Sequence, residues 1–118
     1  MKGDELANRL LDFAVRIIDL SAALMKNPAG RHVAVQIVQA GTSVGAHSEE
    51  ARGAESKADF VHKLRLALKE CRETRYWLKV IQRGKLLPGD FPADLLAEAD
   101  ELCAILGQSI LTTKGRGK

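Results

Sequence analysis

Hydrophobic residues recur along the chain at helical spacing, in four stretches that three breaks separate. In the first stretch, about residues 4–26, apolar side chains follow one another at alternating intervals of four and three residues. This heptad rhythm is typical of a helix that buries one face. The apolar positions are Leu6, Leu10, Phe13, Ile17, Leu20 and Leu24. The first stretch is therefore predicted to be an amphipathic helix.

The second stretch, about residues 31–52, carries two neighbouring rows. The first row is mainly apolar and comprises Val33, Ile37, Ala40, Val44, His47 and Ala51. The second row is made of small residues and Val38, namely Ala34, Val38, Gly41, Gly45 and Ser48. A glycine inside a helix costs about 1 kcal/mol relative to alanine, so two of them one turn apart need a compensating contact. We predict that Ala34, Val38, Gly41 and Gly45 pack closely against another helix or another subunit.

The third and fourth stretches keep the same rhythm. The third, about residues 57–83, opens at Ser56-Lys57-Ala58-Asp59, which has the form of a capping box. Its predicted inward residues are Phe60, Leu64, Ala67, Cys71, Thr74, Leu78 and Ile81. The fourth, about residues 92–111, places Leu95, Ala99, Leu102, Leu106 and Ile110 inward.

Three short breaks, at residues 27–30, 52–56 and 84–89, contain the glycines and prolines that interrupt helices. Short connections place consecutive helices antiparallel. No alternating strand pattern occurs anywhere in the sequence. The sequence therefore predicts a single all-α domain over residues 1–118. It is an antiparallel up-down-up-down four-helix bundle that ends in a basic tail at residues 112–118.

Composition agrees with this prediction, because aromatic residues make up only 4% of the chain and Ala and Leu dominate. No run of 18 apolar residues occurs and the N-terminus is charged, so we expect a soluble, cytoplasmic protein without a membrane segment. The net charge of +3 equals the contribution of Lys114, Arg116 and Lys118 in the tail. Cys71 and Cys103 occupy helical positions and are expected to be reduced, buried thiols.

One face of the third stretch is basic. At 100° per residue, five cations and a tyrosine fall within a sector of about 80°. This basic stripe comprises Arg65, Lys69, Arg72, Tyr76, Lys79 and Arg83. Cations spaced along a rod can follow a phosphate backbone, and an aromatic ring among them offers a stacking surface for a base. The basic stripe is therefore a candidate RNA-binding surface.

A structural explanation of the same stripe stays open. The last helix is acidic and has no base before Lys114; its acids are Asp90, Asp94, Glu98, Asp100 and Glu101. The third helix has eight basic and three acidic residues between positions 57 and 83. The basic stripe is thus equally interpretable as a surface that the acidic helix neutralises within the bundle.

Other groups of polar residues have structural explanations. Folding the second helix onto the third brings Glu50 near Lys63 and predicts an interhelical ion pair. His47 lacks the Glu-x-x-His pattern of di-iron bundles, so we expect a hydrogen-bonded core or interface histidine. No nucleophile with an adjacent base, glycine-rich phosphate loop or zinc cluster is recognisable. We expect no catalysis, cofactor, metal or small-molecule substrate.

The two central helices carry a set of short motifs. They are Gln36-Ile37, Thr42-Ser43-Val44-Gly45-Ala46, Glu50-Ala51, Ser56-x-x-Asp59-Phe60, Lys63-Leu64 and Ala67-Leu68-Lys69-Glu70-Cys71-x-Glu73-Thr74-x-Tyr76-Trp77-Leu78. In these motifs the chain resembles a known family, the bacterial four-helix-bundle proteins encoded by intervening sequences in 23S ribosomal RNA genes. The resemblance covers nearly the whole chain and is densest over residues 36–78. The chain departs from the family pattern at Gln39, where arginine is usual, and at His47, where asparagine is usual.

This resemblance implies a homo-oligomer, specifically a ring-shaped homopentamer, without catalytic activity. Nucleic acid is the ligand that it implies. A more distant, similarly built group serves as accessory subunits of reverse transcriptases. The leading hypothesis is therefore a non-catalytic oligomeric module that binds RNA or an RNA-containing complex. The alternative is a protein-only scaffold or accessory subunit that docks a partner protein, such as a reverse transcriptase or a neighbouring gene's product.

Overall fold

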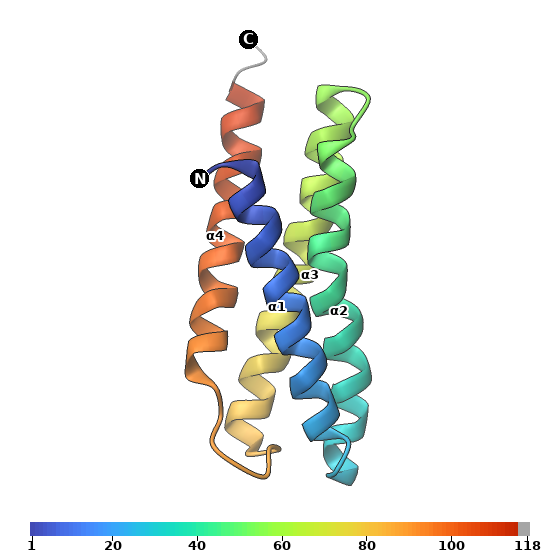
Figure 1. Cartoon of the computed structure of the whole chain (residues 1–118), viewed down its shortest axis with the longest axis vertical. Helices are drawn as coiled ribbons and strands as arrows, with labels where there is room; N and C mark the ends of the chain where they lie inside the picture. The colour runs from blue at the N-terminus through green and yellow to red at the C-terminus, as the bar shows by residue number, and fades with distance from the viewer. Residues whose placement is uncertain (116–118) are drawn as a thin grey trace.

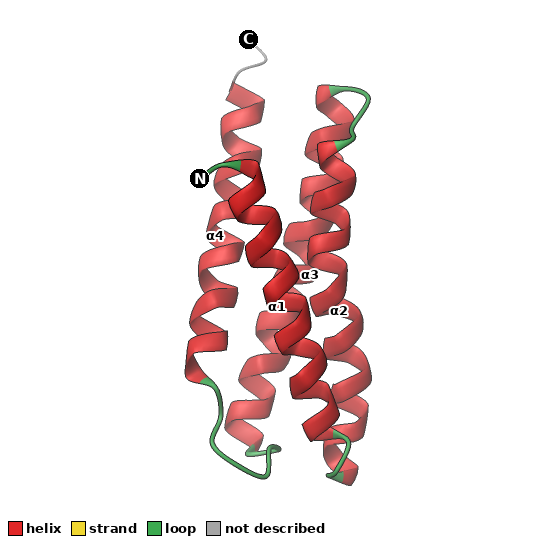
Figure 2. Cartoon of the chain, viewed as in Figure 1, coloured by secondary structure: helices red, strands yellow, loops and turns green. Residues whose placement is uncertain are grey.

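The computed structural model describes residues 1–115, which form an elongated bundle of four helices (Figure 1). The helices are α1 (Gly3–Leu24), α2 (Pro28–Arg52), α3 (Lys57–Gly84) and α4 (Ala93–Gly115). Within these residues there is no strand, and loops join consecutive helices (Figure 2). The bundle measures 50 × 21 × 20 Å. The predicted all-α, four-helix architecture is confirmed.

The buried side of each helix follows the hydrophobic rhythm. Leu10, Phe13, Ile17, Leu20 and Leu24 of α1 are buried, and the apolar positions predicted for α3 and α4 are buried except Phe60, which is half-buried. These side chains form one continuous core with those of α2.

On α2, His47 forms the predicted hydrogen bond, to Glu50 at 2.9 Å, but lies at the edge of the core and not within it. His47 is half-buried, and its neighbour Ser48 takes the inward position with 7% exposure. An α-helix drifts by about 20° per heptad relative to a strict seven-residue repeat. Toward the end of the 25-residue α2, this drift moves position 48 into the core and position 47 toward its edge.

Helix α2 begins at Pro28, three residues earlier than predicted. The side chain of Asn27 caps the helix, because its Oδ1 accepts a hydrogen bond from the Ala29 N–H at 2.9 Å. Proline suits the first helical position, where its missing N–H leaves no bond unmade. Gly30 then allows a tight turn, since a Cβ there would lie 2.6 Å from the Leu24 carbonyl oxygen. The predicted break at residues 27–30 is thus mostly the first turn of α2.

Helix α4 continues to Gly115, so the predicted boundary at residue 111 is wrong. The hydroxyl of Thr113 donates to the Ser109 carbonyl at 2.8 Å, and the amide of Gln108 donates to the Thr112 hydroxyl at 3.1 Å. These side chains continue the helix where the sequence suggested a tail. Of the predicted tail, residues 116–118 lie outside the described residues.

The small-residue row of α2 provides a close approach to α1. A Cβ at Gly41 would lie 2.7 Å from Cγ2 of Ile17, closer than carbon atoms pack. At Gly45, a Cβ would lie 3.4 Å from Cβ of Leu10, an ordinary van der Waals distance. On the same row, Ala34 is buried and Val38 is half-buried. The close approach predicted from this row is made within the chain, and it depends on Gly41.

The helices do not pack equally. Helices α1 with α2, α2 with α3 and α3 with α4 contact one another extensively, whereas α1 and α4 contact one another sparsely. Helix α3 therefore lies between α2 and α4 and presents its remaining side outward (Figure 1). In the described part of the chain, no helix combines the length and the apolar character that crossing a bilayer would require.

Candidate nucleic-acid interface

The six residues of the basic stripe are all exposed on the outward side of α3, and Tyr76 is 59% exposed. The same helix buries Cys71, Thr74 and Leu78 on its opposite side. The 3.6-residue period of the helix separates these two sides and aligns the cations along the bundle. The structure thus presents the predicted surface to solvent without distortion.

The acids of α4 are paired elsewhere. Arg9 of α1 contacts Glu98 at 2.6 Å and Glu101 at 3.1 Å. Arg16 of α1 contacts Asp94 at 2.9 Å. These three acids therefore face α1 across the sparse α1–α4 contact.

Helix α3 contributes one ion pair to α4, between Arg75 and Asp100 at 3.4 Å. Arg75 lies beside the basic stripe and is not part of it. Within residues 1–115, none of the five stripe cations forms an ion pair. Neutralisation of the stripe by α4, the structural explanation that the sequence left open, does not occur within the chain.

Titration behaviour follows these contacts. The hydrogen bond to Glu98 is the main cause that raises the pKa of Arg9 above its ordinary value, despite a smaller opposing effect of burial. The hydrogen bond from Arg16 is the main cause that lowers the pKa of Asp94. Both shifts favour the ionised forms of Arg9 and Asp94, which are the forms that the ion pairs between α1 and α4 require.

Two shallow hollows open along the basic stripe. One, of about 280 Å³, is lined by Arg65, Leu68, Lys69 and Arg72. The other, of about 530 Å³, is lined by Lys57, Ala58, Val61, Arg65 and Lys114. No acidic residue lines either hollow. The part of the basic stripe from Arg65 to Arg72 therefore borders two shallow hollows that cationic and apolar side chains line.

Sequence reasoning missed Lys57 and Lys114 as members of this surface. Lys57 lies outside the sector of the stripe on a helical wheel, and Lys114 was assigned to a tail after α4. Only the observed length of α4 brings Lys114 to the beginning of α3. The available signal was the absence of proline between residues 93 and 114.

Tyr76 belongs to an aromatic group on the outer side of α3. Its ring meets the Trp77 ring edge to face, with centroids 5.1 Å apart. The ring of His32 on α2 meets Trp77 in the same manner at 6.2 Å. The indole N–H of Trp77 donates to the carboxylate of Glu73 at 3.1 Å, which fixes its orientation. Trp77 is thus a fixed support for Tyr76, whose exposed ring can accept a stacked base.

The predicted ion pair between Glu50 and Lys63 does not form. Glu50 is exposed and accepts the contact of His47 Nδ1 at 2.9 Å, three residues earlier on the same helix. Ala51, the next residue, faces the core near the end of α2. Because neighbouring helical residues point about 100° apart, Glu50 is turned away from the inner side of α3.

Comparison with known proteins identifies the fold and the family. The family model described as "23S rRNA-intervening sequence protein" matches residues 5–108. The chain belongs to the 23S rRNA-intervening sequence protein family. A search of curated proteins gave no match.

A solved relative supports this membership. The crystal structure of a protein with unknown function from the S23 ribosomal protein family of Bacteroides thetaiotaomicron superposes with a TM-score of 0.82. The two sequences are 35% identical, and the match covers 89% of this chain and 97% of the relative. The resemblance noted from residues 36–78 is thereby confirmed.

Two positions of this member of the 23S rRNA-intervening sequence protein family depart from the pattern expected for the family. Gln39 is exposed on α2, and its carbonyl accepts a hydrogen bond from the Ser43 hydroxyl at 2.6 Å. His47 contacts Glu50, as described above. Neither residue lies on α3 or lines a hollow of the basic stripe, so both departures leave that surface unchanged.

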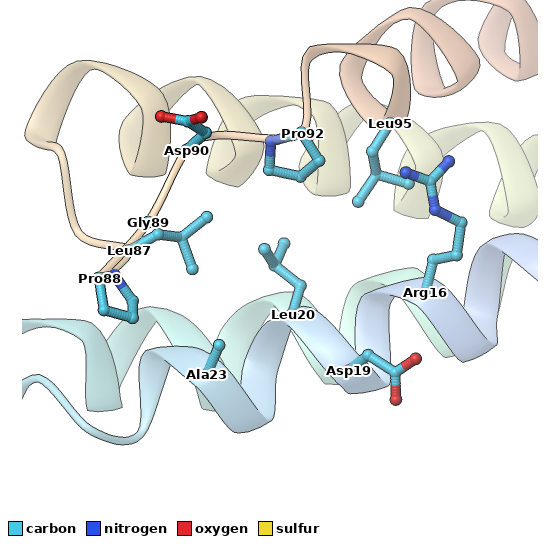
Figure 3. Close-up of a pocket in the computed structure, with 10 residues that line it drawn as sticks. All are labelled: Arg16, Asp19, Leu20, Ala23, Leu87, Pro88, Gly89, Asp90, Pro92 and Leu95. Atoms are coloured by element: carbon cyan, nitrogen blue, oxygen red, sulfur yellow. The ribbon is translucent and has the colours of Figure 1, made fainter.

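A further hollow, of about 350 Å³, lies between α1 and the loop that precedes α4 (Figure 3). Leu20 and Leu87 point toward one another across it, and Asp19 is turned away. Its one cation, Arg16, is held by Asp94. No serine, cysteine or histidine lines this hollow. Among residues 1–115, no group of three or more potential ligands is placed to hold a metal ion.

The two cysteines are free and buried where α3 contacts α4. The thiol of Cys71 donates to the Ala99 carbonyl, with the sulfur 3.6 Å from the oxygen. Its pKa is raised, first by a hydrogen bond with the Cys103 thiol and then by burial. Cys71 therefore acts as a protonated core residue at neutral pH, as its position in the heptad pattern predicted.

Proposed function

We propose that this protein is a non-catalytic, self-assembling module that binds RNA along the basic stripe of α3. One observation supports the proposal above all others: five exposed cations surround an exposed aromatic ring, and no acid within residues 1–115 pairs with them. When unpaired Lys and Arg side chains neutralise RNA phosphates, they release the counterions condensed on the RNA, and this release is a large part of the affinity of proteins for nucleic acids. The ring of Tyr76 adds a stacking surface that tolerates any base.

We propose RNA as the polyanion that the basic stripe binds because of the family to which the chain belongs. Its description refers to 23S ribosomal RNA, and the related crystal structure is assigned to a ribosomal protein family. The basic stripe has no asparagine or glutamine that would read a base edge. Binding is therefore expected to depend on the backbone and to show weak sequence preference.

Self-assembly is the second part of the proposal. Helix α1 exposes Leu11 by 63%, Val15 by 52% and Ile18 by 48%, and α2 exposes Val35 by 48%. We name these four residues the apolar face. Beside it, an open groove of about 450 Å³ runs between α1 and α2, lined in part by Ala7, Ala14 and Ala46. Contiguous exposed apolar surface is typical of a protein–protein contact.

A second copy of the chain is the occupant we propose for the apolar face, in the ring-shaped homopentamer that the resemblance implies. Helix α1 does not pack against α3, so a contact through α1 leaves the basic stripe open. A ring would repeat the stripe on each subunit and multiply its phosphate contacts. Docking of a different protein, such as a polymerase, is the competing use of the same face. A purified protein that is monomeric would favour that second function.

The test of RNA binding is a titration with a fluorescent single-stranded RNA at several salt concentrations. Each neutralised phosphate contributes a slope of about −0.7 to log K against log salt. Five cations on one chain predict a slope of about −3.5, and a steeper one if several subunits engage the same strand. Absence of binding at low salt, or an affinity that salt does not change, would contradict the proposal.

A further inference from the structure

The hollow at the junction of α3 and α4 differs from the rest of the basic stripe in the origin of its charges. Lys57 and Arg65 come from the beginning of α3, and Lys114 comes from the end of α4. All three side chains are exposed, and within residues 1–115 none forms an ion pair. Two acids, Glu55 and Asp59, lie two residues from Lys57, and neither lines the hollow; the Asp59 carboxylate accepts a hydrogen bond from the Glu55 N–H. Three cations from two helices therefore share one space of about 530 Å³.

We infer that this hollow binds the terminal phosphate monoester of an RNA strand that lies on the basic stripe. A phosphodiester in the strand carries one negative charge, whereas a phosphate monoester carries about −1.5 to −2 at pH 7 and has three strong acceptor oxygens. Three converging cations match the monoester better than the diester. The buried side chain of Val61 lines the same hollow, and an apolar wall strengthens the attraction between ions beside it.

The place of the hollow also fits the end of a strand. Arg65 lines both this hollow and the next one along the stripe, so the two are continuous. The stripe ends at Arg65, and the hollow extends the cationic surface from there to Lys57, the first residue of α3. A strand that follows the cations toward the beginning of α3 therefore reaches the hollow where the surface stops. This inference rests on the proposed RNA binding.

The experiment compares three forms of one single-stranded RNA: without a terminal phosphate, with a 5′-phosphate and with a 3′-phosphate. In each phosphorylated strand the fluorescent label is on the end that lacks the phosphate, and the protein is full-length. One phosphorylated form is expected to bind about tenfold more tightly than the unphosphorylated strand, which corresponds to one additional charge-assisted contact. Lys114→Ala and Lys57→Ala should each reduce this preference, and the double variant should abolish it. Binding of the unphosphorylated strand should also weaken, because both lysines belong to the cationic surface, but by a smaller factor than binding of the phosphorylated strand.

Lys26→Ala is the matched control. Lys26 is an exposed lysine in the turn between α1 and α2. Figure 1 shows this turn at the opposite end of the bundle from the beginning of α3 and the end of α4. This variant loses the same charge and should keep the full preference. Circular dichroism verifies that all variants are folded, as expected for exposed side chains.

Each other outcome separates the inference from the proposed function. Equal affinity for the three strands, with RNA binding intact, would overturn the inference and leave RNA binding in place. A preference that survives Lys57→Ala/Lys114→Ala would place the terminal phosphate elsewhere and would also overturn it. Failure of all three strands to bind would contradict the proposed function and the inference with it.

Discussion

Arg9 of α1 holds Glu98 of α4 through two parallel hydrogen bonds, with Nη2 and Nε at 2.6 and 3.0 Å from the two carboxylate oxygens. This bidentate pair lies where α1 and α4 otherwise contact one another sparsely. It also occupies an acid that the sequence alone would allow to face α3. The pair thereby stabilises the contact between α1 and α4. Within residues 1–115, the cations of the basic stripe are left without an acidic partner.

The first prediction concerns this pair. A double-mutant cycle of Arg9→Ala and Glu98→Ala should give a coupling energy of about 1 kcal/mol, because the geometry is bidentate and both side chains are only 26% exposed. The Arg52–Asp4 pair is the comparison, since its side chains are 44% and 86% exposed. Its cycle should give a value near zero. Urea denaturation at fixed protein concentration measures both, and equal coupling energies in the two cycles would refute this difference.

The second prediction concerns helix-interior glycines. Gly41→Ala should destabilise the fold by about 1–3 kcal/mol, because the new Cβ would overlap Ile17. Gly107→Ala is the matched control on α4, where a Cβ would meet no atom within 4 Å. That change should stabilise the protein by up to about 1 kcal/mol through helix propensity. Melting temperatures should therefore move in opposite directions, and a rise in both would show that Gly41 is not at a tight contact.

The third prediction concerns assembly. The double change Leu11→Glu and Val15→Glu should prevent the proposed self-assembly, because it places charges in a contact that is expected to be dry. Helicity should stay intact, since both side chains are exposed in the single chain. Leu111→Glu on α4 is the control, as Leu111 is 65% exposed and lies outside the apolar face. Light scattering gives the masses. A variant with the mass of the wild-type oligomer would exclude the apolar face as the subunit contact.

Much of this fold could be predicted from apolar spacing alone. On α1, α3 and α4, every third or fourth residue is apolar, and that spacing leaves one side of the helix to bury. On α2 the pattern was less decisive, because two neighbouring rows could both face the core. Only the packing against Ile17 shows that Gly41, and not Gly45, is required for the close approach of α1. The start of α2 was missed because Asn27 and Pro28 suit both a loop and a capped helix start.

The partners of charged residues could not be predicted in the same way. Spacing assigns a residue to one side of a helix and does not say which neighbouring helix that side faces. The sequence was compatible with ion pairs between the acids of α4 and the basic stripe, but in the structure Arg9 and Arg16 of α1 pair with Glu98 and Asp94. Glu50 likewise contacts His47 on its own helix and does not pair with Lys63. Lys114 joined the cationic surface only because α4 is longer than its apolar pattern.

The central claim is that the basic stripe binds RNA, and one triple variant tests it most directly. Arg65→Glu, Arg72→Glu and Lys79→Glu together should weaken binding of a single-stranded RNA at least about a hundredfold. Helicity and oligomer mass should stay unchanged, because these exposed side chains form no ion pair within residues 1–115. The control reverses Lys2, Lys26 and Arg31, three exposed cations outside α3, which changes the net charge equally. Retained RNA affinity in a folded triple variant, or an equal loss in the control, would contradict the claim.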